Sequence, residues 1–589
     1  MNKITGDSLT QNLRIQTGIK RGQVVEIDIE GRTVRAHEGE TIGAVLAASG
    51  IRKIRLSPHG QDPRGMYCCM GLCHDCLVTV DGQPNVRACV TPVQAGQQIT
   101  LQKGLGRFDT DLPQPPSARL VHHHVPLVII GGGPAGLSAA IAAARWGGQV
   151  LVIDENSQPG GQIYRQLPHT FQVNNPATLG LDHLEGQSLL SELAKMSDRV
   201  TIWGDAQVWS VFNSRQLAVA RNDELVLLDA KAIVVATGAY ERPVPVPGWT
   251  LPGVMTVGGA QVLLKSQRIR PGHRVLLAGT GPLQLVVANQ MLDVGVDVVS
   301  VAESASTRDA WRYIFDLLHH PRLLMHGLGY LRRLKRHGIP LLRSHVLKAV
   351  HGNGQVERAV LSQIGSRGNA IVGNTKAFDV DTVCIGYGLI PSIWLTNMLG
   401  CKHAYNPLVG GWVPYFDNNM QTDQEGVFVA GDGAGVAGAL VARRQGTIAG
   451  LFAAAYAGVI ATGQAERIGL LARKQLMSLQ KFRRAVDCIY QTYPAIYRNV
   501  TDDTVVCRCE GVKAGVIRRA IKKGTTDLND VKKRTRTGMG YCQGANCMPT
   551  VAAMLSHEFR VKAEEIKMTT TRPPFRPIPM NLLMVEADS

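Results

Sequence analysis

The sequence predicts an α/β protein in which two dinucleotide-binding units lie between two cysteine-rich modules. The first observation is the stretch Leu127–Asn156, where an apolar run, the turn GGGPAG, a small-residue segment and a second apolar run follow one another. The second is a repeat of this arrangement that begins at Arg274. The third is the cysteine distribution, with five cysteines between residues 68 and 89 and four between 507 and 547.

The first unit has the strand, turn, helix and strand order of a dinucleotide-binding βαβ motif. Its glycines permit a tight turn, a close backbone approach to a pyrophosphate and close helix packing. The helix N-terminus would bind the diphosphate through free N–H groups, and Asp154, or Glu155 in its place, would bind the ribose hydroxyls. A glycine turn that merely opens a helix is the alternative. The predicted contacts are Gly131, Gly133, Pro134, Ala135, Gly136, Asp154 and Glu155.

Length and composition favour a multidomain cytoplasmic protein. A chain of 589 residues can form several domains. The N-terminus lacks the apolar core of a secretory signal, and the apolar run 451–461 is shorter than the roughly 20 residues that span a bilayer. The net charge of +17 has no nucleic-acid-binding motif beside it, so we expect no nucleic acid and a solvated basic surface or an acidic docking partner.

The N-terminal module predicts an iron–sulfur site. A hairpin over Val24–Ile29 and Arg32–Val34 and a helix over residues 41–48 are expected before the cysteines. In a cytoplasmic protein these cysteines would not form disulfides. Their spacing, C-x4-C-x2-C and a further cysteine, is the plant-type [2Fe–2S] pattern, with Cys69 as an alternative first ligand and zinc as an alternative metal. The predicted ligands are Cys68, Cys73, Cys76 and Cys89.

The C-terminal module predicts a second [2Fe–2S] site. Two short cysteine pairs are separated by a helical stretch that would bring them together. Lysines and arginines around them would favour a negatively charged cluster, while zinc remains the alternative. The pattern resembles the bacterioferritin-associated-ferredoxin-like domain. The predicted ligands are Cys507, Cys509, Cys542 and Cys547.

Three segments resemble flavoproteins of the glutathione-reductase type, which contain two dinucleotide-binding domains. The turn PGGQIYR lies where that family passes near the flavin, and ATG leads from the first nucleotide domain into an inserted one. A Gly-Asp pair after a late strand places its aspartate on the ribityl chain of FAD. The resemblance assigns cofactor contacts to Gly161, Gln162, Thr237, Gly238, Gly431 and Asp432.

The second unit departs from the dinucleotide fingerprint. Gln284 occupies the position of the third glycine, where a side chain is expected to obstruct helix packing. Glu303 ends the following strand. We interpret this unit as a nucleotide-binding fold that serves structure, with NAD(P)H binding in doubt. The insert has no C-x2-C pair, which disfavours dithiol chemistry.

The predicted architecture is a two-dinucleotide-binding-domain flavoprotein with glutathione-reductase-like Rossmann domains, an N-terminal plant-type ferredoxin (β-grasp) domain and a small C-terminal helical [2Fe–2S] domain. The expected boundaries are 1–110 for the ferredoxin domain, 111–125 for a linker that includes His122–His124, 126–250 and 386–465 for the two parts of the FAD or nucleotide domain, 251–385 for the NAD(P)-binding-like insert, 466–500 for a connecting helix, 501–565 for the C-terminal domain and 566–589 for an extended tail.

This module order resembles the large (α) subunit of heteromeric FAD/FMN/[2Fe–2S] amino-acid or opine dehydrogenases, of the hydrogen cyanide synthase, octopine or nopaline oxidase and dye-linked proline or hydroxyproline dehydrogenase types. It also resembles the sarcosine oxidase α subunit. The resemblance implies a hetero-oligomer in which a D-amino-acid-oxidase-like FAD subunit oxidises the amine and an FMN lies between the subunits. Electrons would then pass through the clusters to a quinone or redox protein, through which any membrane association would arise.

Two other functions stay open at this level. The chain could be a self-sufficient NAD(P)H:acceptor oxidoreductase, or a structural subunit whose first site holds FAD or another adenine nucleotide. No catalytic acid, base or nucleophile stands out by its spacing. This absence fits an electron-transfer subunit.

Overall fold

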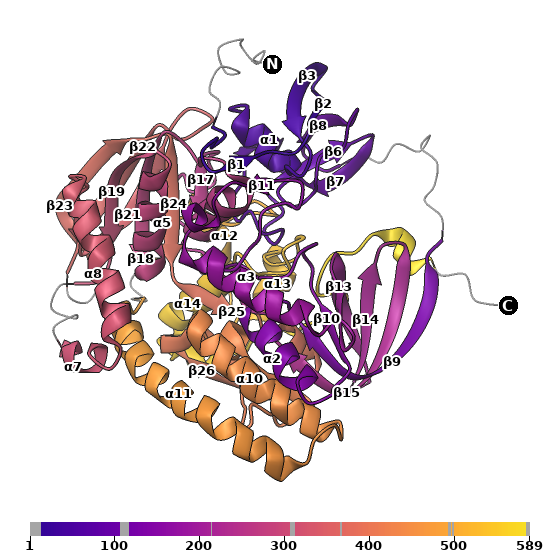
Figure 1. The fold of residues 1–589 in the computed structure, drawn as a ribbon. Coiled ribbons are helices and arrows are strands. Elements are labelled where there is room, and N and C mark those ends of the chain that lie inside the picture. Colours follow the sequence, from indigo (N-terminus) through magenta and orange to yellow (C-terminus); the bar gives the residue numbers. More distant parts are fainter. Residues whose placement is uncertain are drawn as a thin grey trace.

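The computed structural model describes residues 13–59, 61–106, 117–213, 215–306, 312–365, 368–492, 496–497 and 500–584. Two α/β domains lie beside each other, the N-terminal domain contacts the insert, and the C-terminal helices lie behind both (Figure 1). None of the helices in these ranges is both long and apolar enough to cross a lipid bilayer.

The first nucleotide domain is built on a parallel sheet that a meander extends. Because strands buried on both faces read as continuous apolar runs, the runs before and after GGGPAG become neighbouring strands, paired Leu127 to Val150. The strand order is β12-β10-β9-β15-β14-β13, with β28 also on β15. The strands are β9 (Arg119–Ile130), β10 (Val150–Ile153), β12 (Val200–Trp203), β13 (Ala206–Phe212), β14 (Gln216–Arg221), β15 (Glu224–Val235) and β28 (Val427–Val429).

Two helices from distant parts of the sequence pack together in this domain. They are α2 (Pro134–Ala144) and α10 (Ala439–Tyr456). A Cβ added at Gly446 would lie 2.0 Å from the carbonyl oxygen of Ala135, and one at Gly450 would lie 2.2 Å from that of Ala139. The close approach depends on these glycines.

The prediction of a linker over residues 111–125 is wrong for residues 119–125. Residues 119–125 belong to β9, which pairs with β15 from Arg119 onward. The histidines His122–His124 are exposed, but their backbone is part of the sheet. The strand continues because the β13–β15 meander extends the sheet and supplies a partner edge. Residues 111–116 of the predicted linker lie outside the described residues.

The insert begins with a five-stranded parallel sheet in the order β17-β24-β18-β19-β20. A separate antiparallel sheet, β21-β22-β23, follows. The elements are β17 (Val254–Thr256), α4 (Val257–Val262), η3 (Leu263–Gln267), β18 (Arg274–Thr280), α5 (Pro282–Asp293), β19 (Asp297–Glu303), α7 (Ile314–Leu317), α8 (Pro321–Arg336), β20 (Leu341–Arg343), β21 (His345–His351), β22 (Arg358–Ile364), β23 (Ala370–Asp379) and β24 (Thr382–Tyr387).

The N-terminal domain confirms the predicted hairpin and helix. Strand β2 (Val24–Ile29) pairs with β3 (Arg32–His37), and α1 (Ile42–Ala48) starts after Thr41, whose hydroxyl accepts from the N–H of Ala44. The remaining elements are β1 (Ile19–Lys20), β4 (Arg55–Leu56), β5 (Pro63–Arg64), β6 (Leu77–Val80), β7 (Gln83–Arg87) and β8 (Gln98–Lys103).

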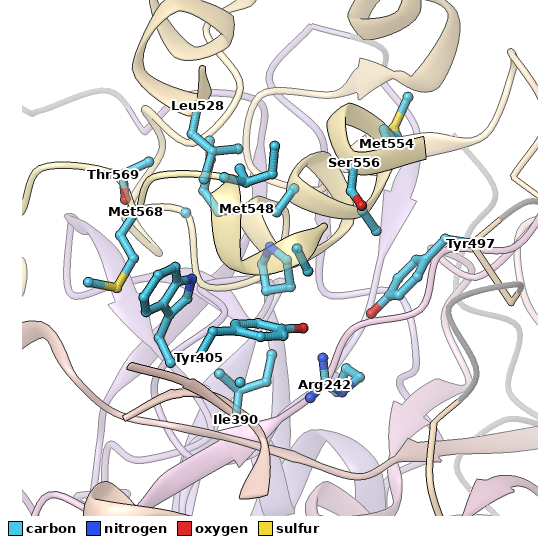
Figure 2. A pocket seen from close by; sticks show the side chains of 18 of the residues that line it. Arg242, Ile390, Tyr405, Tyr497, Leu528, Met548, Met554, Ser556, Met568 and Thr569 are labelled. Atoms are coloured by element: carbon cyan, nitrogen blue, oxygen red, sulfur yellow. The ribbon is translucent and has the colours of Figure 1, made fainter. Parts of the chain in front are cut away.

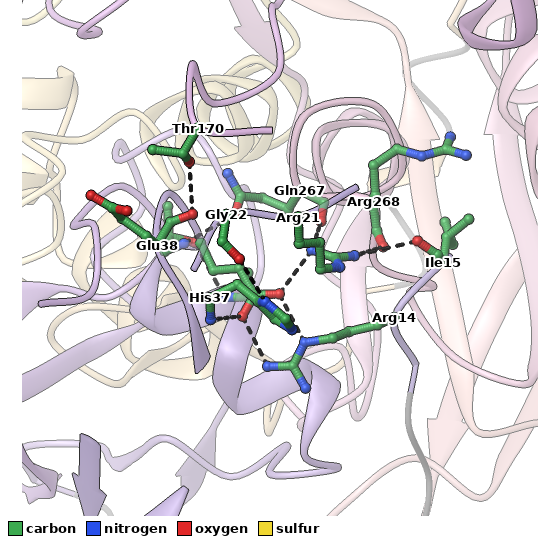
Figure 3. A network of polar contacts seen from close by, with 12 residues as sticks. Arg14, Ile15, Arg21, Gly22, His37, Glu38, Thr170, Gln267 and Arg268 are labelled. Carbon is green, nitrogen blue, oxygen red and sulfur yellow. Dashed lines mark hydrogen bonds and ion pairs between the residues drawn. The ribbon is translucent and has the colours of Figure 1, made fainter. Parts of the chain in front are cut away.

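A buried arginine, which also forms an ion pair within this domain, attaches the domain to the insert (Figure 3). Arg21 Nη1 lies 2.8 Å from Glu40 Oε1, while the same guanidinium donates to the backbone oxygens of Gln267 and Arg268. Thr170 of the first nucleotide domain donates to the Glu38 carbonyl at 2.7 Å. The N-terminal domain therefore contacts both nucleotide domains.

The connecting helix begins and ends earlier in the sequence than predicted. Helix α11 covers Thr462–Ile489 instead of 466–500, because Gly458 ends α10 in a left-handed turn and the chain turns at once into the new helix. The C-terminal domain contains the expected helices. Its elements are β29 (Val505–Cys507), β30 (Val512–Lys513), α12 (Ala514–Lys522), α13 (Leu528–Thr535), α14 (Met548–Phe559), η7 (Ala563–Glu565) and η8 (Met580–Leu583).

The C-terminal tail returns to the first sheet, where the Phe575 N–H donates to the carbonyl of Trp209 at 3.1 Å. The elements between the domains are β11 (Gln172–Val173), η2 (Pro176–Leu179), α3 (Leu181–Ala194), β16 (Ala239–Glu241), β25 (Leu389–Pro391), α9 (Trp394–Met398), β26 (His403–Asn406), η4 (Pro407–Val409), β27 (Gly411–Pro414) and η5 (Gly431–Ala434).

Candidate cofactor-binding sites

The first glycine turn has the backbone geometry that the sequence predicts. Gly131 has a φ of +106°, which favours glycine. A Cβ on Gly136 would lie 1.8 Å from the Gly131 carbonyl oxygen. Gly133 is the N-cap of α2 and gives the helix no side-chain cap, while Pro134 and Ala135 form its first turn. These features fit an anion at the helix N-terminus, and nucleotide contact by these residues stays a prediction.

The two candidate ribose-binding acids lie in different surroundings. Asp154 is buried, and its carboxylate accepts from the N–H groups of Gly132 at 2.6 Å and Asn156 at 2.7 Å. Burial raises its pKa. Glu155 lies 3.6 Å from the Arg576 guanidinium. Asp154 therefore supports the glycine turn directly.

The PGGQ turn lies against GGGPAG. The Gly160 N–H donates to the Gly132 carbonyl at 2.8 Å, and a Cβ on Gly161 would lie 2.8 Å from the Gly133 Cα. The Gln162 side chain accepts from Arg165. The structure thus brings the two predicted glycine turns into direct contact.

The ATG and Gly-Asp segments also meet. A Cβ on Gly433 would lie 3.4 Å from the Thr237 hydroxyl and 3.5 Å from the backbone of Gly238. Asp432, which follows Gly431 in η5, accepts 2.9 Å hydrogen bonds from the N–H groups that precede α10. Two segments far apart in sequence therefore lie side by side, and their role as one cofactor site stays a prediction.

A cavity of about 150 Å³ lies between the two nucleotide domains. Its lining includes Asp432, Gly281 of the second turn, Tyr490 and Glu241. Burial raises the pKa of Glu241 to about 7, and its carboxylate accepts from the Gly258 N–H at 3.0 Å. Sequence reasoning missed Glu241, although its position directly after the ATG segment was a usable signal.

Gln284 is accommodated in the second unit, so the expected obstruction of helix packing is wrong. Its side chain is buried and donates through Nε2 to Glu303 Oε2 at 2.6 Å. The Gly281 and Ala305 N–H groups donate to the same carboxylate, and burial raises the Glu303 pKa to about 7. The Gln284 amide thus fills the space that the third glycine usually leaves. It also hydrogen-bonds to Glu303, the acid at the position that binds a ribose in the dinucleotide motif.

The first set of predicted cluster ligands forms two pairs of buried thiols. The Cys68 thiol forms a hydrogen bond with that of Cys73, which lowers the pKa of Cys68 to about 6. Cys76 forms one with Cys89, which with burial raises the pKa of Cys76. Cys69 lies outside both pairs, and burial raises its pKa.

The second set is paired in the same way. Cys507 forms a hydrogen bond with Cys547, which lowers the Cys507 pKa to about 7, and Cys509 forms one with Cys542. Two pairs match a cluster in which four thiolates hold two irons. Within the described ranges, no three His, Cys, Asp or Glu side chains form a group suited to one metal ion.

The two sets meet in the buried interior, which the sequence did not indicate. The Cys509 sulfur lies 3.9 Å from the Cys73 carbonyl oxygen. Arg508, between two ligands of the second set, forms an ion pair with Asp75, between two ligands of the first. Both side chains are buried. Their positions beside the cysteines in sequence were the only available signal.

A larger cavity, of about 1040 Å³, lies between the first nucleotide domain, the residues that follow α11 and the C-terminal domain. Figure 2 shows Arg242, Tyr405 and Tyr497 on one side and Met548, Ser556 and other C-terminal residues on the other. The rings of Tyr240 and Trp394, which also line it, stack at 5.1 Å. The segment between Cys542 and Cys547 forms part of its wall. No local sequence pattern marks this cavity, because its lining residues come from distant parts of the chain.

Three family models match this chain. The model for pyridine nucleotide-disulphide oxidoreductases matches residues 125–446. A 2Fe-2S iron-sulfur cluster binding domain matches residues 22–104, and a BFD-like [2Fe-2S] binding domain matches residues 505–557. These matches confirm the predicted fold class.

Curated relatives lie in the family that the sequence resembles. An opine oxidase subunit from Agrobacterium tumefaciens (strain Ach5) is 34% identical, over 77% of this chain and 90% of its own length. The hydrogen cyanide synthase subunit HcnB of Pseudomonas aeruginosa is 34% identical, over 72% of this chain and 90% of its length.

One solved structure has the same fold over nearly the whole chain. The L-proline dehydrogenase from P. horikoshii matches with a TM-score of 0.72 at 22% identity, covering 98% of this chain and 100% of that one. The chain therefore belongs to the pyridine nucleotide-disulphide oxidoreductase family, as an oxidoreductase with a flavin-binding domain and two [2Fe–2S]-binding domains that is related to the opine oxidase subunit.

Proposed function

We propose that this chain is the electron-transfer subunit of a heteromeric flavin-dependent dehydrogenase or oxidase. A D-amino-acid-oxidase-like partner subunit would oxidise an amino acid, an opine or a related secondary amine, and this chain would pass the electrons to a quinone or redox protein. The observation that carries the proposal is the contact between the two cysteine sets, Cys509 to Cys73, beside a cavity large enough for a flavin. The relatives named as enzyme subunits support it.

The first nucleotide site would hold FAD or another adenine nucleotide. Gly133 and Gly161 have no side chains to block the approach of a diphosphate. Together with the start of α2 they would give it a backbone surface. Asp432 and the small cavity would receive the part of the cofactor that extends toward the insert. A bound flavin accepts two electrons and releases them singly.

The larger cavity is our candidate for an FMN at the interface with the partner subunit. Its volume is that of a cofactor site, and its aromatic side chains suit a planar ring system. Arg242 lines it and has a buried Nε for which the described residues supply no hydrogen-bond partner. The positive charge of its guanidinium would favour a phosphate group in the cavity. The C-terminal cysteine loop forms part of the wall, which would keep the transfer distance short.

The buried surroundings of the predicted ligands would exclude water from both clusters. All eight predicted ligands are buried, and low exposure is one of the factors that set cluster potentials. Glu303 and Gln284 hydrogen-bond each other in the second nucleotide unit, which argues against an NAD(P)H-driven enzyme.

Purification with the catalytic subunit tests this proposal. We expect about four irons and four acid-labile sulfides per chain. Anaerobic addition of the amine should bleach the flavin and produce two cluster signals by electron paramagnetic resonance. Zinc at both cysteine sets, or full reduction of the isolated chain by NADH or NADPH, would contradict the electron-transfer function. A colourless chain with full nucleotide occupancy would favour the structural role.

A variant that fills the large cavity tests the FMN site. Ala553 lines the cavity from α14, so Ala553→Trp should remove FMN while the first nucleotide and the iron stay bound. Val516→Trp places the same side chain on an exposed position of α12 and should leave all cofactors in place. Retention of FMN by Ala553→Trp would exclude this cavity.

A further inference from the structure

Arg508 also joins the two cysteine sets, in addition to the contact between the Cys509 sulfur and the Cys73 carbonyl. Arg508 Nε lies within hydrogen-bond distance of Asp75 Oδ2, and Arg508 Nη1 donates to the Trp249 carbonyl at 2.9 Å. The Arg508 guanidinium also lies 4.0 Å from the Tyr67 ring centroid and 4.6 Å from that of Trp249. Groups from the N-terminal domain and from the nucleotide-binding core therefore hold this one arginine of the C-terminal domain in place.

The Arg508–Asp75 pair is fully buried. The side chains are 1% and 0% exposed. Arg508 separates Cys507 from Cys509, and Asp75 directly precedes Cys76. Each residue of this ion pair therefore lies in a loop that carries predicted cluster ligands. A shift of either side chain would move the cysteines of one set relative to those of the other.

The charges around Asp75 do not balance. Arg55 donates to its carbonyl and lies 3.4 Å from its carboxylate. Arg64, which is also buried, is the residue opposite Arg55 in the β4–β5 pair. Three buried cations therefore face one buried anion.

The excess positive charge on Arg64 is only partly compensated by the protein. Arg64 Nε and Nη2 are buried and, among the described residues, have no hydrogen-bond acceptor, while Asp62, at 3.7 Å, is half exposed. Buried, uncompensated cations are costly. A cysteine-ligated [2Fe–2S] cluster is an anion and gains a further negative charge on reduction, and net charge is one of the factors that set its potential.

We propose that Arg508 is a positioning residue that holds the two cluster loops in contact, and that with Arg55 and Arg64 it supplies the positive charge that favours reduction of both centres. The inference rests on the proposed electron-transfer function. The two cysteine sets would hold clusters that exchange one electron, with no proton transferred and no bond formed or broken, and the arginines would act on that exchange through their charge alone. The arginine excess makes the reduced state of either centre easier to form.

Charge variants of the full chain test this inference. Arg508→Gln removes one buried positive charge and should lower the equilibrium constant for one-electron reduction at least tenfold at both centres, which is about 59 mV. Asp75→Asn removes the buried negative charge and should shift it the opposite way. Arg536→Gln is the matched control, because Arg536 lies 2.9 Å from Glu510, next to Cys509, but is 67% exposed. Water screens that charge, so the shift should stay below threefold.

A lysine variant separates charge from position. Arg508→Lys keeps the positive charge but loses the planar contacts with Tyr67 and Trp249. The potentials should stay near the wild-type values, while the magnetic interaction between the two reduced centres should weaken. If Asp75→Asn does not fold, Arg55→Gln takes its place. It should lower both potentials as Arg508→Gln does, and raised or unchanged potentials in this variant would overturn the inference.

Iron and sulfide are measured first in each protein, and potentials follow from a redox titration monitored by electron paramagnetic resonance. A wild-type chain without two [2Fe–2S] clusters would overturn the proposed function itself. With both clusters present, shifts of the same sign in Arg508→Gln and Asp75→Asn, or no shift in either, would overturn this inference alone. Opposite shifts, together with a small effect of Arg536→Gln, would support it.

Discussion

The contact between Gly136 and the first glycine turn gives a quantitative test of the nucleotide site. In Gly136→Ala the new methyl group would lie 1.8 Å from the Gly131 carbonyl oxygen and 3.2 Å from Ile129 Cγ2. Non-bonded heavy atoms are normally about 3.5 Å apart or more. Helix α2 would therefore have to move away from the turn, because the opposing atom belongs to the backbone and cannot rotate aside.

The expected loss is large for a single methyl group. Overpacking a well-packed interior costs about 1–3 kcal/mol, and we expect about 3 kcal/mol because the clash is with backbone. With a shift of about 2–4 °C per kcal/mol for a domain of this size, the thermal midpoint should fall by about 6–12 °C. The displaced helix N-terminus should also release the nucleotide.

Gly329→Ala is the matched control. Gly329 lies in α8, and a Cβ added there meets no atom within 4 Å. The same substitution should therefore stabilise the protein, by up to about 1 kcal/mol through helix propensity. The assay compares thermal midpoints and the adenine nucleotide released by acid from each protein. A Gly136→Ala protein with an unchanged midpoint and full nucleotide content would refute the argument.

Two further predictions concern buried titratable groups. Cys68→Ser should lose one cluster and about two of four irons, whereas Cys69→Ser should keep both clusters, because Cys69 lies outside the thiol pairs; iron analysis decides, and equal losses would contradict the choice of Cys68. Burial raises the Glu303 pKa from 4.5 to about 7, so the folded protein binds an extra proton between these values and its free energy of unfolding should fall by about 2 kcal/mol from pH 5.5 to pH 8. Glu303→Gln should remove this part of the pH dependence of the unfolding free energy, which urea unfolding measures at each pH. An unchanged pH dependence would contradict the prediction.

The parts of the fold that the sequence predicted are those with local signals. Glycine turns between apolar runs define both nucleotide units, and cysteine spacing defines both terminal domains. The register of β9 with β10 follows from the two buried runs. The linker failed as a prediction because PQPP and HHH suggest an exposed connection, while pairing with β15 is a long-range effect that no local pattern records.

The candidate site was predictable in composition but not in arrangement. The cysteines could be assigned from spacing, yet nothing in the sequence places Cys509 beside Cys73. Likewise, Gln284 was expected to disturb packing because a glycine usually occupies its position. The structure instead uses its amide as a donor to Glu303, which compensates for the larger side chain.

The segment that leads from the first nucleotide domain into the insert explains how two terminal domains come to share one interface. Trp249 Nε1 donates to the Val505 carbonyl just before the second cysteine set, and the Trp249 carbonyl accepts from Arg508. A few residues later, the Thr256 N–H donates to the carbonyl of Tyr67, next to Cys68. One short core segment thus fixes both cysteine loops. Because each loop is anchored to it by backbone groups, their spacing depends on the flavin-binding core as well as on the ion pair between them.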